Sequence, residues 1–373
     1  MTGTITRRGK QSWRLKYDIP RDESGERRIA YATVNGTRKD AEKELRAKLS
    51  AIDRGVHVDP TRETLAEFLD FWLETVAPQT VAPKALERYR GLARNQIKPY
   101  LGTMQLQKLR PAHVDRWHHT LVSEGKISNR TIRHAHAVLS GALGHAAKTE
   151  IVERNVAAII KPPKADKPTI ASLTESQMTE TLAKLDGHSF YPIAAVAIGT
   201  GARRGEIAGL IWSDIDLDAR TVTIQRSIEQ TMAGLRIKPP KTMAGKRTIS
   251  LPAIAVDALR QHRHQTLELR MRLGMGTLPS DAPVFGKIEG GWSRPYSFSD
   301  RWRDVVKSRN LPKITFHGLR HSHASALIAK GVDIVTVSHR LGHQSAAFTL
   351  ATYSHLFSDS DSKVAAAIDA VFS

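Results

Sequence analysis

The sequence contains no cysteine among its 373 residues. This absence excludes disulfide bonds, thiolate metal sites and a cysteine nucleophile. Long apolar runs are missing too: no stretch approaches the ~20 residues that a membrane span requires, so we expect no membrane contact. The N-terminus lacks the apolar core of a signal peptide, and we expect a soluble cytoplasmic protein.

Acidic residues are scarce relative to basic ones. The chain has 56 Lys and Arg against 37 Asp and Glu, a net charge of +19 at pH 7. The excess is spread out: residues 1–60 contribute +5, residues 61–165 contribute +7 and the remainder +7. Such a charge indicates a polyanionic partner, and its even spread indicates that every part of the chain contacts it. At this length we expect two or three domains.

Residues 1–58 are predicted to form a small αβ module. Apolar residues at positions 13, 15 and 17 alternate with Arg14 and Lys16, which is the period of a strand. A returning strand is expected at 27–34 and a charged helix at 39–54. A small sheet backed by one helix, with basic residues on its open face, suits a DNA groove. The alternative is a small module with a solvated charged face.

Residues 61–160 are predicted to form an all-helical basic domain. Thr64-Leu-Ala-Glu67 is a capping-box pattern that opens the first helix. Pro111 suits the first position of the third helix, and Ser128 caps the fourth. The candidate DNA-contacting residues on these helices are Arg88, Arg94, Arg130 and Arg133. We expect His134 and His136 on the outer side of the fourth helix as well. An ordinary helical bundle remains the alternative, because pattern alone does not exclude it.

The rest of the chain is predicted to be a separate α+β domain. Residues 161–169 are rich in Pro and Lys and should form an extended, semi-rigid linker. In residues 170–373, helical patterns surround three expected strands at 221–226, 234–238 and 246–251. The expected fold is therefore multi-domain and mainly α, with small β-sheets.

Reactive side chains are densest between His317 and Tyr353. A helix is predicted from 322 to 330, with His317 and Arg320 at or just before its first turn. Unpaired backbone N–H groups and the positive end of the helix dipole favour an anion there. A second helix should end at Gly342 and place His343 just beyond it. One guanidinium, two imidazoles and a phenol gathered in this way suit a phosphodiester.

Five short motifs follow one another in a fixed order over about 150 residues of the C-terminal domain. They are Thr-Gly-Ala-Arg203-Arg-Gly-Glu206, Pro240-Lys241-Thr242, His317-Gly-Leu-Arg320, Leu-Gly-His343 and Thr-Tyr353-Ser. Each is weak alone, but together their order and spacing resemble the tyrosine recombinase (phage integrase) family. Residues 61–160 resemble the family's helical core-binding domain. The N-terminal module is similar to the arm-site-binding domain of lambda-like and transposon-type integrases.

The resemblance implies a site-specific recombinase that cleaves and rejoins DNA through a 3′-phosphotyrosyl intermediate, to integrate and excise a phage or mobile element. It makes Tyr353 the nucleophile and His317 its proton acceptor. It assigns Arg203, Arg320 and His343 to the phosphate oxygens. Lys241 would protonate the leaving 5′-oxygen, and Glu206 would orient Arg203 or its neighbours. The reaction needs no nucleotide cofactor and no metal, because the phosphotyrosyl ester keeps the bond energy for religation.

The resemblance also implies partners. The chain should bind double-stranded DNA at core and arm attachment sites, within the nucleoid of a bacterial cell. Two duplexes must be cut, so we expect a homotetramer on DNA, with a C-terminal helix at about 363–372 packing on a neighbouring copy. Host DNA-bending or directionality factors are possible further partners.

Four other interpretations compete with this one, two for local segments and two for the whole chain. His317, His321 and His323 could suggest zinc, but positions two apart on a helix face different ways, and strong zinc patterns carry His-Glu-x-x-His or cysteines. We expect His321 and His323 to be scaffold or DNA-facing residues instead. The Asp-rich segment 214–218 mimics the start of a calcium loop but lacks its glycine and its final glutamate. A non-catalytic DNA-binding regulator of the same fold and a metal-dependent nuclease remain alternatives for the whole chain.

Overall fold

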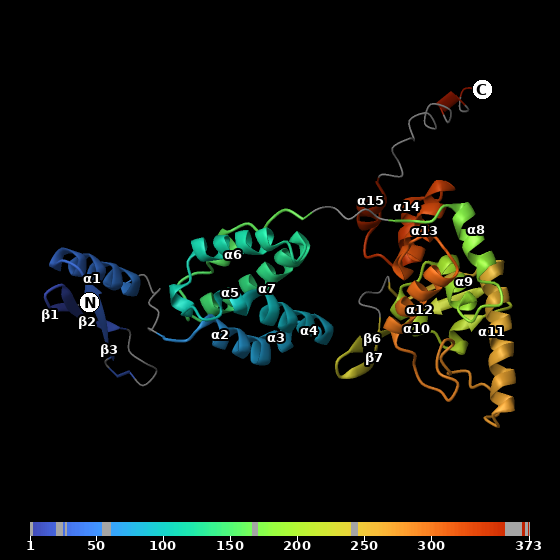
Figure 1. Cartoon of the computed structure of the whole chain (residues 1–373), viewed down its shortest axis with the longest axis horizontal. Coiled ribbons are helices and arrows are strands. Elements are labelled where there is room, and N and C mark those ends of the chain that lie inside the picture. Colours follow the sequence, from blue (N-terminus) through green and yellow to red (C-terminus); the bar gives the residue numbers. More distant parts are fainter. Residues whose placement is uncertain are drawn as a thin grey trace. The chain divides into compact units, whose positions relative to one another are not determined.

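The computed structural model describes residues 3–19, 25–26, 28–53, 61–165, 171–239, 245–354, 368–369 and 372. The chain divides into two compact units, Met1–Lys167 and Pro168–Ser373 (Figure 1). Three sequence predictions lie outside the described residues: Lys241, the end of the 161–169 linker, and nearly all of the expected C-terminal helix. In the part that is described, no helix combines the length and apolar character needed to cross a membrane.

The N-terminal unit begins with a three-stranded antiparallel sheet in the order β1 (Gly3–Gly9), β2 (Ser12–Ile19), β3 (Arg28–Asn35). Leu15 and Tyr17 are buried, whereas Lys16 is exposed, as the alternation predicted. Helix α1 (Arg38–Asp53) packs on the buried face and contributes Ala41 and Leu45 to the core (Figure 1). The predicted αβ arrangement of this region is confirmed.

Helices follow in the same unit, and prolines interrupt two of them. The predicted capping box is present: Thr64 and Glu67 bond reciprocally at the start of α2 (Leu65–Phe71). A π-helical turn then leads into α3 (Ala77–Thr80), and a second one joins α4 (Pro83–Leu92) to α5 (Lys98–Leu101). Each π turn ends just before a helix with proline in its first turn. Since proline cannot donate the usual helical bond, the wider turn accommodates it.

The longest helices of this region are α6 (Pro111–Glu124) and α7 (Asn129–Lys148), which begin at the predicted Pro111 and Ser128 signals. The interpretation that His136 lies on the outer side of α7 is wrong. His136 is buried, and its Nδ1 lies 3.2 Å from Nε2 of the buried His118 on α6. In the sequence, a polar residue such as His136 at a buried helix position cannot be told apart from polar residues on the exposed face.

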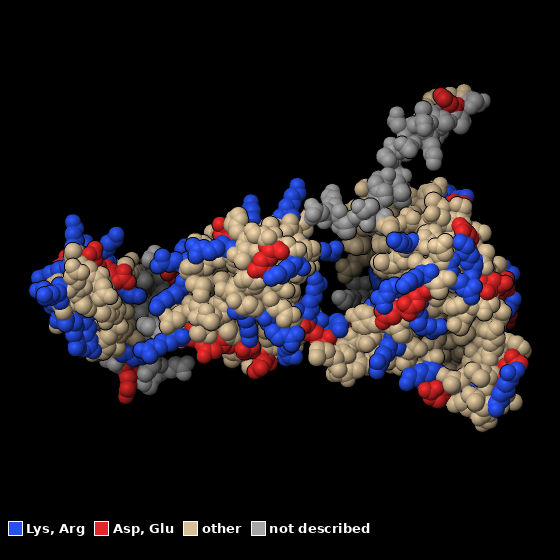
Figure 2. Space-filling view, viewed as in Figure 1, with Lys and Arg blue, Asp and Glu red and all other residues tan. Residues whose placement is uncertain are grey.

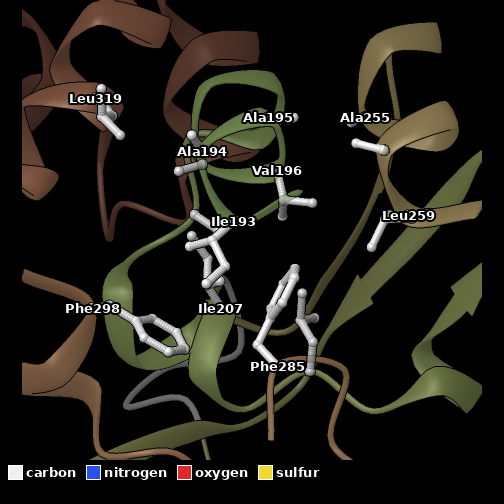
Figure 3. Packing of buried hydrophobic residues seen from close by; sticks show 14 of the residues in the cluster. Ile193, Ala194, Ala195, Val196, Ile207, Ala255, Leu259, Phe285, Phe298 and Leu319 are labelled. Carbon is white, nitrogen blue, oxygen red and sulfur yellow. The ribbon is translucent and has the colours of Figure 1, made fainter. Parts of the chain in front are cut away.

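The C-terminal unit is built around α9 (Tyr191–Thr200), which is buried on almost every side. It packs against α11 (Ala253–Arg272) and α13 (Phe316–Ala329). Figure 3 shows Ile193 and Val196 of α9 close to Phe285 and Phe298 in this core. The other helices are α8 (Glu175–Lys184), α10 (Arg204–Ala208), α12 (Pro295–Ser308), α14 (Ile334–Leu341) and α15 (Ala346–Tyr353).

Two small sheets accompany these helices. β4 (Ile215–Asp216), β5 (Thr221–Ile224) and β8 (Arg247–Ser250) form one, and β6 (Ser227–Thr231) pairs with β7 (Gly234–Lys238) in a separate hairpin. The sequence predicted β5, β7 and β8 but missed β4 and β6. The expected class, mainly α with small antiparallel sheets in several domains, is confirmed.

The start of α13 differs from the prediction. The helix begins at Phe316, six residues before the expected Ser322, because the Thr315 side chain accepts from the backbone N–H of Gly318 and caps it. His317 therefore lies in the first turn, and Arg320 just beyond it. A histidine-glycine pair does not mark a helix start in sequence, since glycine usually weakens one.

Candidate active site

Arg320 is almost completely buried beneath the site, with 4% of its surface exposed. Its Nη1 donates to the carbonyl of Gly201 and its Nη2 to the carbonyl of Leu341, both at 2.8 Å. Burial and then the nearby Arg203 lower the pKa of Arg320 to about 9, so it stays protonated at neutral pH. Two fixed carbonyls therefore hold its charged plane in one orientation.

Arg203 stands at the start of α10 and is more exposed. Its Nη1 donates to Glu206 Oε1 at 2.9 Å, and its Nη2 donates to the carbonyl of Gly342 at 3.0 Å. Its backbone N–H also donates to Glu206 Oε2, so the glutamate closes the first turn of the helix. About two fifths of the Arg203 side chain faces solvent, which leaves it free to meet an anion.

Glu206 is buried and accepts hydrogen bonds from two arginines. Burial alone would raise its pKa, but Arg247 and then Arg203 lower the pKa of Glu206 below its usual value. Arg247 Nη2 donates to Glu206 Oε2 at 3.0 Å, and Arg247 Nε donates to the carbonyl of Arg340 at 2.7 Å. Glu206 thus neutralises part of a cluster of three buried or half-buried cations.

Arg247 was not identified from the sequence. In the structure its side chain is fully buried. A weak signal existed. In β8, residues 247 and 249 are buried while 248 and 250 are exposed, so strand alternation places an arginine on the inward face. A charge at such a position requires a buried partner, and here that partner lies 41 residues earlier in the chain.

The three arginines share one anchor, the C-terminal end of α14. The carbonyls of residues 340, 341 and 342 accept bonds from Arg247, Arg320 and Arg203. The last carbonyls of a helix have no partner within it and carry the negative end of its dipole. This helix end therefore lets three guanidiniums gather with a single carboxylate among them.

Arg340 and His323 also hold the C-terminal end of α14 in place. Arg340 Nε donates to His323 Nε2 at 3.0 Å, and His323 Nδ1 donates to the carbonyl of Ile198. Gly201, in the first motif, has φ +64°, and a Cβ there would lie 2.6 Å from the His323 ring. His323 is thus part of the scaffold, as expected, and the motif's glycine is required both by conformation and by space.

His343 lies beside Arg203 in the wall of a cavity of about 680 Å³, which Lys238 and Phe348 also line. Its Nδ1 is 2.6 Å from the hydroxyl of the buried Thr349 on α15. Burial and then Arg320 and Arg203 lower the pKa of His343 to about 3. The imidazole is therefore neutral at pH 7, and its Nδ1 is the nitrogen that contacts the protein among the described residues.

His317 is exposed at the first turn of α13. Partial desolvation, then His321 and Arg320, lower the pKa of His317 to about 4. Its ring centroid lies 4.9 Å from that of His321, one turn further along the helix. His317 is thus a neutral imidazole at the surface of the site, able to accept a proton or to donate one hydrogen bond.

Tyr353, the last residue of α15, is 1% exposed. Its ring belongs to a small apolar cluster with Ile328 and Leu341, and burial raises the pKa of Tyr353 to about 12. Its hydroxyl lies 2.8 Å from Nδ1 of His321. The sequence interpretation treated His321 as scaffold or DNA-facing, and it did not foresee that this histidine meets the tyrosine.

The structure therefore brings most of the predicted catalytic set into one part of the C-terminal unit. Arg203 and Arg320 share the end of α14, Glu206 binds Arg203, and His343 lines the cavity beside them. Tyr353 joins the set through His321 and α13. Lys241 lies outside the described residues.

The predicted DNA-contacting residues belong to the N-terminal unit. Arg14 stacks over the ring of Tyr31 at 4.1 Å, on the sheet face opposite α1. The four predicted arginines on the helices are all exposed: Arg88, Arg94, Arg130 and Arg133. Lys and Arg side chains are scattered over the visible surface of this unit, between larger areas of other residues (Figure 2). Their exposure suits contact with phosphate, and their role stays a prediction.

No group of three or more His, Asp or Glu side chains suited to a metal ion occurs among the residues that the structure describes. His321 and His323 point to different partners, Tyr353 and Ile198. Asp214 bonds Arg226 and Gln225, and Asp216 accepts from two backbone N–H groups of the following turn. The acidic segment is therefore a turn before a strand.

Comparison with known proteins adds a family. Residues 171–359 match the phage integrase family, and residues 64–122 match the phage integrase N-terminal SAM-like domain. The chain is 27% identical to a tyrosine recombinase XerC-like protein of Caldanaerobacter subterraneus, covering 93% of each. It is 26% identical to the ICEBs1 integrase of Bacillus subtilis, covering 92% of each.

Two solved structures share the fold. One is the Tn1549 transposon integrase in complex with transposon right end DNA, with a TM-score of 0.65 and 21% identity over 78% of this chain and 94% of that one. The other is a lambda integrase dimer bound to a core site, with a TM-score of 0.58 and 17% identity over 96% and 95% of the two chains.

Proposed function

Because the chain belongs to the phage integrase family of tyrosine recombinases, which cleave and rejoin DNA at specific sites, we propose that Tyr353 is its nucleophile. Arg203, Arg320 and His343 then bind the scissile phosphate, with Glu206 as a positioning residue, and the family resemblance makes His317 the proton acceptor. Lys241 protonates the leaving group. The observation that carries this proposal is the convergence of two arginines on one helix end, close to a histidine-bonded tyrosine.

The two arginines match the charge of the reaction. A phosphodiester is anionic, so it repels an attacking oxygen, and negative charge grows on the pentacovalent transition state. Arg203 and Arg320 are held by carbonyls before any DNA binds. Donors fixed in this way stabilise developing charge without reorganising, and losing one donor of this kind costs about 10²–10³ in rate.

Attack by the Tyr353 oxygen breaks the bond from phosphorus to the 5′-oxygen. The product is a 3′-phosphotyrosyl link and a free 5′-hydroxyl. The ester is conserved, so the 5′-hydroxyl of a second duplex can attack the same link, and strands are exchanged without a nucleotide cofactor or a metal. Lys241 donates the proton that the leaving 5′-oxygen requires.

A trapping experiment tests this function. A core-site duplex nicked beside the scissile phosphate loses its short fragment after cleavage, so the covalent adduct accumulates. Wild-type protein should form this adduct in EDTA, and Tyr353→Phe should form none. If wild-type protein forms no adduct, the recombinase activity is refuted. Adduct formation by the phenylalanine variant would refute the nucleophile assignment. A metal-dependent nuclease would require Mg²⁺ and would release free ends.

We also propose a division of labour between the parts of the chain. Residues 1–58 bind arm-type sites, residues 61–160 bind the core site, residues 161–169 link them to the rest, and residues 170–373 cut. Relatives support the use of DNA, since the matched integrases were seen bound to it. Removing residues 1–58 should abolish integration and leave core-site cleavage intact. Integration by the shortened protein on ordinary substrates would refute the arm-site role.

Assembly on DNA is part of the same proposal. A lambda integrase structure is a tetramer on a Holliday junction. We propose that this chain also forms a homotetramer on DNA, through its C-terminal segment, on attachment sites within the bacterial nucleoid and with host bending or directionality factors. Mass photometry of the protein on a synthetic junction, with and without residues 356–373, tests the assembly. Equal tetramer populations would refute the role of that segment.

A further inference from the structure

Helix α15 is tied to the site by two histidines. His343 meets the hydroxyl of Thr349 at 2.6 Å, and His321 meets the hydroxyl of Tyr353 at 2.8 Å. The two hydroxyl residues are four positions apart, so they lie on the same face of the helix. Both are buried, with 0% and 1% of their surfaces exposed. The reacting oxygen of the proposed nucleophile therefore already has one specific polar partner, and it is His321.

We propose that His321 is a catalytic residue that takes the proton from Tyr353 during attack and returns it during religation. The inference rests on the proposed role of Tyr353 as nucleophile. It reassigns the proton acceptor. The family resemblance pointed to His317, whereas the tyrosine hydroxyl contacts the histidine one turn later on α13.

The direction of the hydrogen bond follows from the chemistry of the two groups. At pH 7 both are neutral, and a phenol is a far stronger proton donor than a neutral imidazole. Tyr353 therefore donates, and His321 Nδ1 carries the lone pair that accepts. The distance of 2.8 Å is within the range that proton transfer requires of a general base.

The surroundings keep His321 neutral. Burial and then Arg320 lower the pKa of His321 below 6.5. His317 faces it from the preceding turn of α13, and His343 faces it from the loop after α14. No carboxylate is among these neighbours in the part of the chain that the structure describes, and the groups that do face His321 favour its neutral form.

The step balances without a further reactant. As the bond between Tyr353 Oη and phosphorus forms, the Oη–H bond breaks and its proton moves to His321 Nδ1, which becomes an imidazolium. The electron pair of the bond from phosphorus to the 5′-oxygen leaves with that oxygen, which takes its proton from Lys241. In religation a 5′-hydroxyl attacks phosphorus and gives its proton back to the neutral amine of Lys241. The bond from Oη to phosphorus breaks, and the imidazolium returns its proton to Oη.

The transfer also requires DNA. The pKa of Tyr353 is raised to about 12, far above that of His321, so the proton stays on the phenol in the free protein. A bound phosphate brings negative charge beside His321 and raises the pKa of the imidazole, because a nearby anion favours the charged form. Proton transfer is thereby coupled to the arrival of the scissile phosphate.

The test compares cleavage by wild-type protein, His321→Gln and the control His264→Gln, whose side chain is exposed on α11. The nicked core-site duplex is the substrate, and adduct formation is timed in single turnovers across pH. His321→Gln should cut about 10²–10⁴ times more slowly at pH 7. Its rate should then rise about tenfold per pH unit through the alkaline range, since only ionised Tyr353 attacks without a base. The control should match wild type.

A second substrate separates the two proton transfers. A 5′-bridging phosphorothiolate has a thiolate leaving group that needs no proton, so it restores activity when the general acid is lost. Lys241→Ala should recover on it, and His321→Gln should not. Added imidazole should accelerate His321→Ala. DNA binding by each variant, measured by gel shift, confirms that the protein is folded.

Outcomes divide cleanly. Three results would each overturn the proposal. They are cleavage by His321→Gln at the wild-type rate, rescue of that variant by the phosphorothiolate, and a pH–rate profile of that variant parallel to that of wild type. If His321→Gln and His321→Ala bind no DNA, the pH profile and imidazole response are read instead from His321→Asn, whose shorter amide can still accept from the phenol. Failure of the recombinase assignment itself would show separately, as wild-type protein without any Tyr353-dependent adduct.

Discussion

The arginines of the N-terminal sheet and those of the C-terminal site have the same charge and opposite surroundings. Arg14 lies on an open face, stacked over the half-exposed ring of Tyr31, and Lys16 beside it is exposed. Arg320 and Arg247 are 4% and 3% exposed, and backbone carbonyls fix their guanidiniums.

The difference shows what each region can do with a phosphate. An exposed cation adapts to the DNA backbone, contributes modest energy and is screened by salt. A buried, pre-fixed cation has lost its water before the phosphate arrives, so its interaction with developing charge is strong. Binding and catalysis therefore place different demands on the same side chain, and four expected results test the contrast.

Breaking the buried network should give the largest effect. Glu206→Gln removes the carboxylate that both Arg203 and Arg247 contact. Leaving buried cations uncompensated should cost about 3–5 kcal/mol in the free energy of unfolding. Urea unfolding of the full chain, followed by tryptophan fluorescence, measures it. Glu229→Gln, which opens the more exposed Lys238 pair, should cost about 0–1 kcal/mol. Equal losses in the two variants would show that burial does not matter.

A substitution that keeps the positive charge of Arg320 but loses its planar geometry should give the second-largest effect. In Arg320→Lys, a single ammonium cannot bond both carbonyls and also hold a phosphate in two places. Adduct formation on the nicked substrate should slow by about 10²–10³, with core-site affinity little changed. Arg14→Lys should leave cleavage unaltered. A fast Arg320→Lys enzyme would mean that charge alone suffices.

Lowering the pH should destabilise the C-terminal site more than the N-terminal sheet, and this effect should be smaller than the two above. A histidine whose pKa is lowered by folding stabilises the protein fully above its unfolded pKa near 6.5, and that stability is lost as the pH falls toward the folded value. His323, with its pKa at about 4, and His343, at about 3, should each cost about 1.4 kcal/mol per pH unit in this window.

The sheet and α1 offer the internal control for this acid effect, since residues 3–53 contain no histidine. Hydrogen exchange of peptides at pH 7.5 and 5.5, corrected for intrinsic rates, should show lost protection in α13 and α14 but not in β2. Below pH 4.5 the loss should steepen, because the lowered pKa of Glu206 makes its contribution disappear as it protonates. Equal losses in sheet and site would contradict the assignment.

The smallest effect is expected on the sheet itself. Arg14→Ala should reduce the salt dependence of arm-site binding by about 0.9 in the log–log slope, the value for one phosphate contact. Core-site cleavage should be unchanged. Binding titrations at several salt concentrations measure the slope, and an unaltered slope would place Arg14 away from the backbone of the DNA.

Local signals predicted a large part of the fold. Alternation placed Arg14 and Lys16 on the open sheet face, and cap residues such as Thr64 and Ser128 fixed helix starts. The motifs around Arg203 and Arg320 predicted that these two residues lie together, and the structure places both at the end of α14. Such features depend on neighbours within a few residues, which a sequence displays directly.

Features that depend on distant partners were missed. Arg247 is placed by Glu206 and by the end of α14, and His321 is defined by a tyrosine 32 residues later. His136 looked solvent-facing because its partner His118 lies on another helix. In each case the sequence does not show which partner the side chain meets. For Arg247, strand alternation indicates an inward-facing side chain but not the glutamate that it contacts.

The contact between His321 and Tyr353 also has a consequence for how mixtures of wild-type and variant chains cut DNA. The tyrosine, its histidine and the arginines at the end of α14 are supplied by one chain. In a mixture of wild-type and Tyr353→Phe chains, the share of strands cut should then equal the share of wild-type chains. A tyrosine lent by a neighbouring copy would still give a straight line in that mixture. Mixing Tyr353→Phe with Arg320→Ala chains separates the two, since only exchange between copies could restore a working pair.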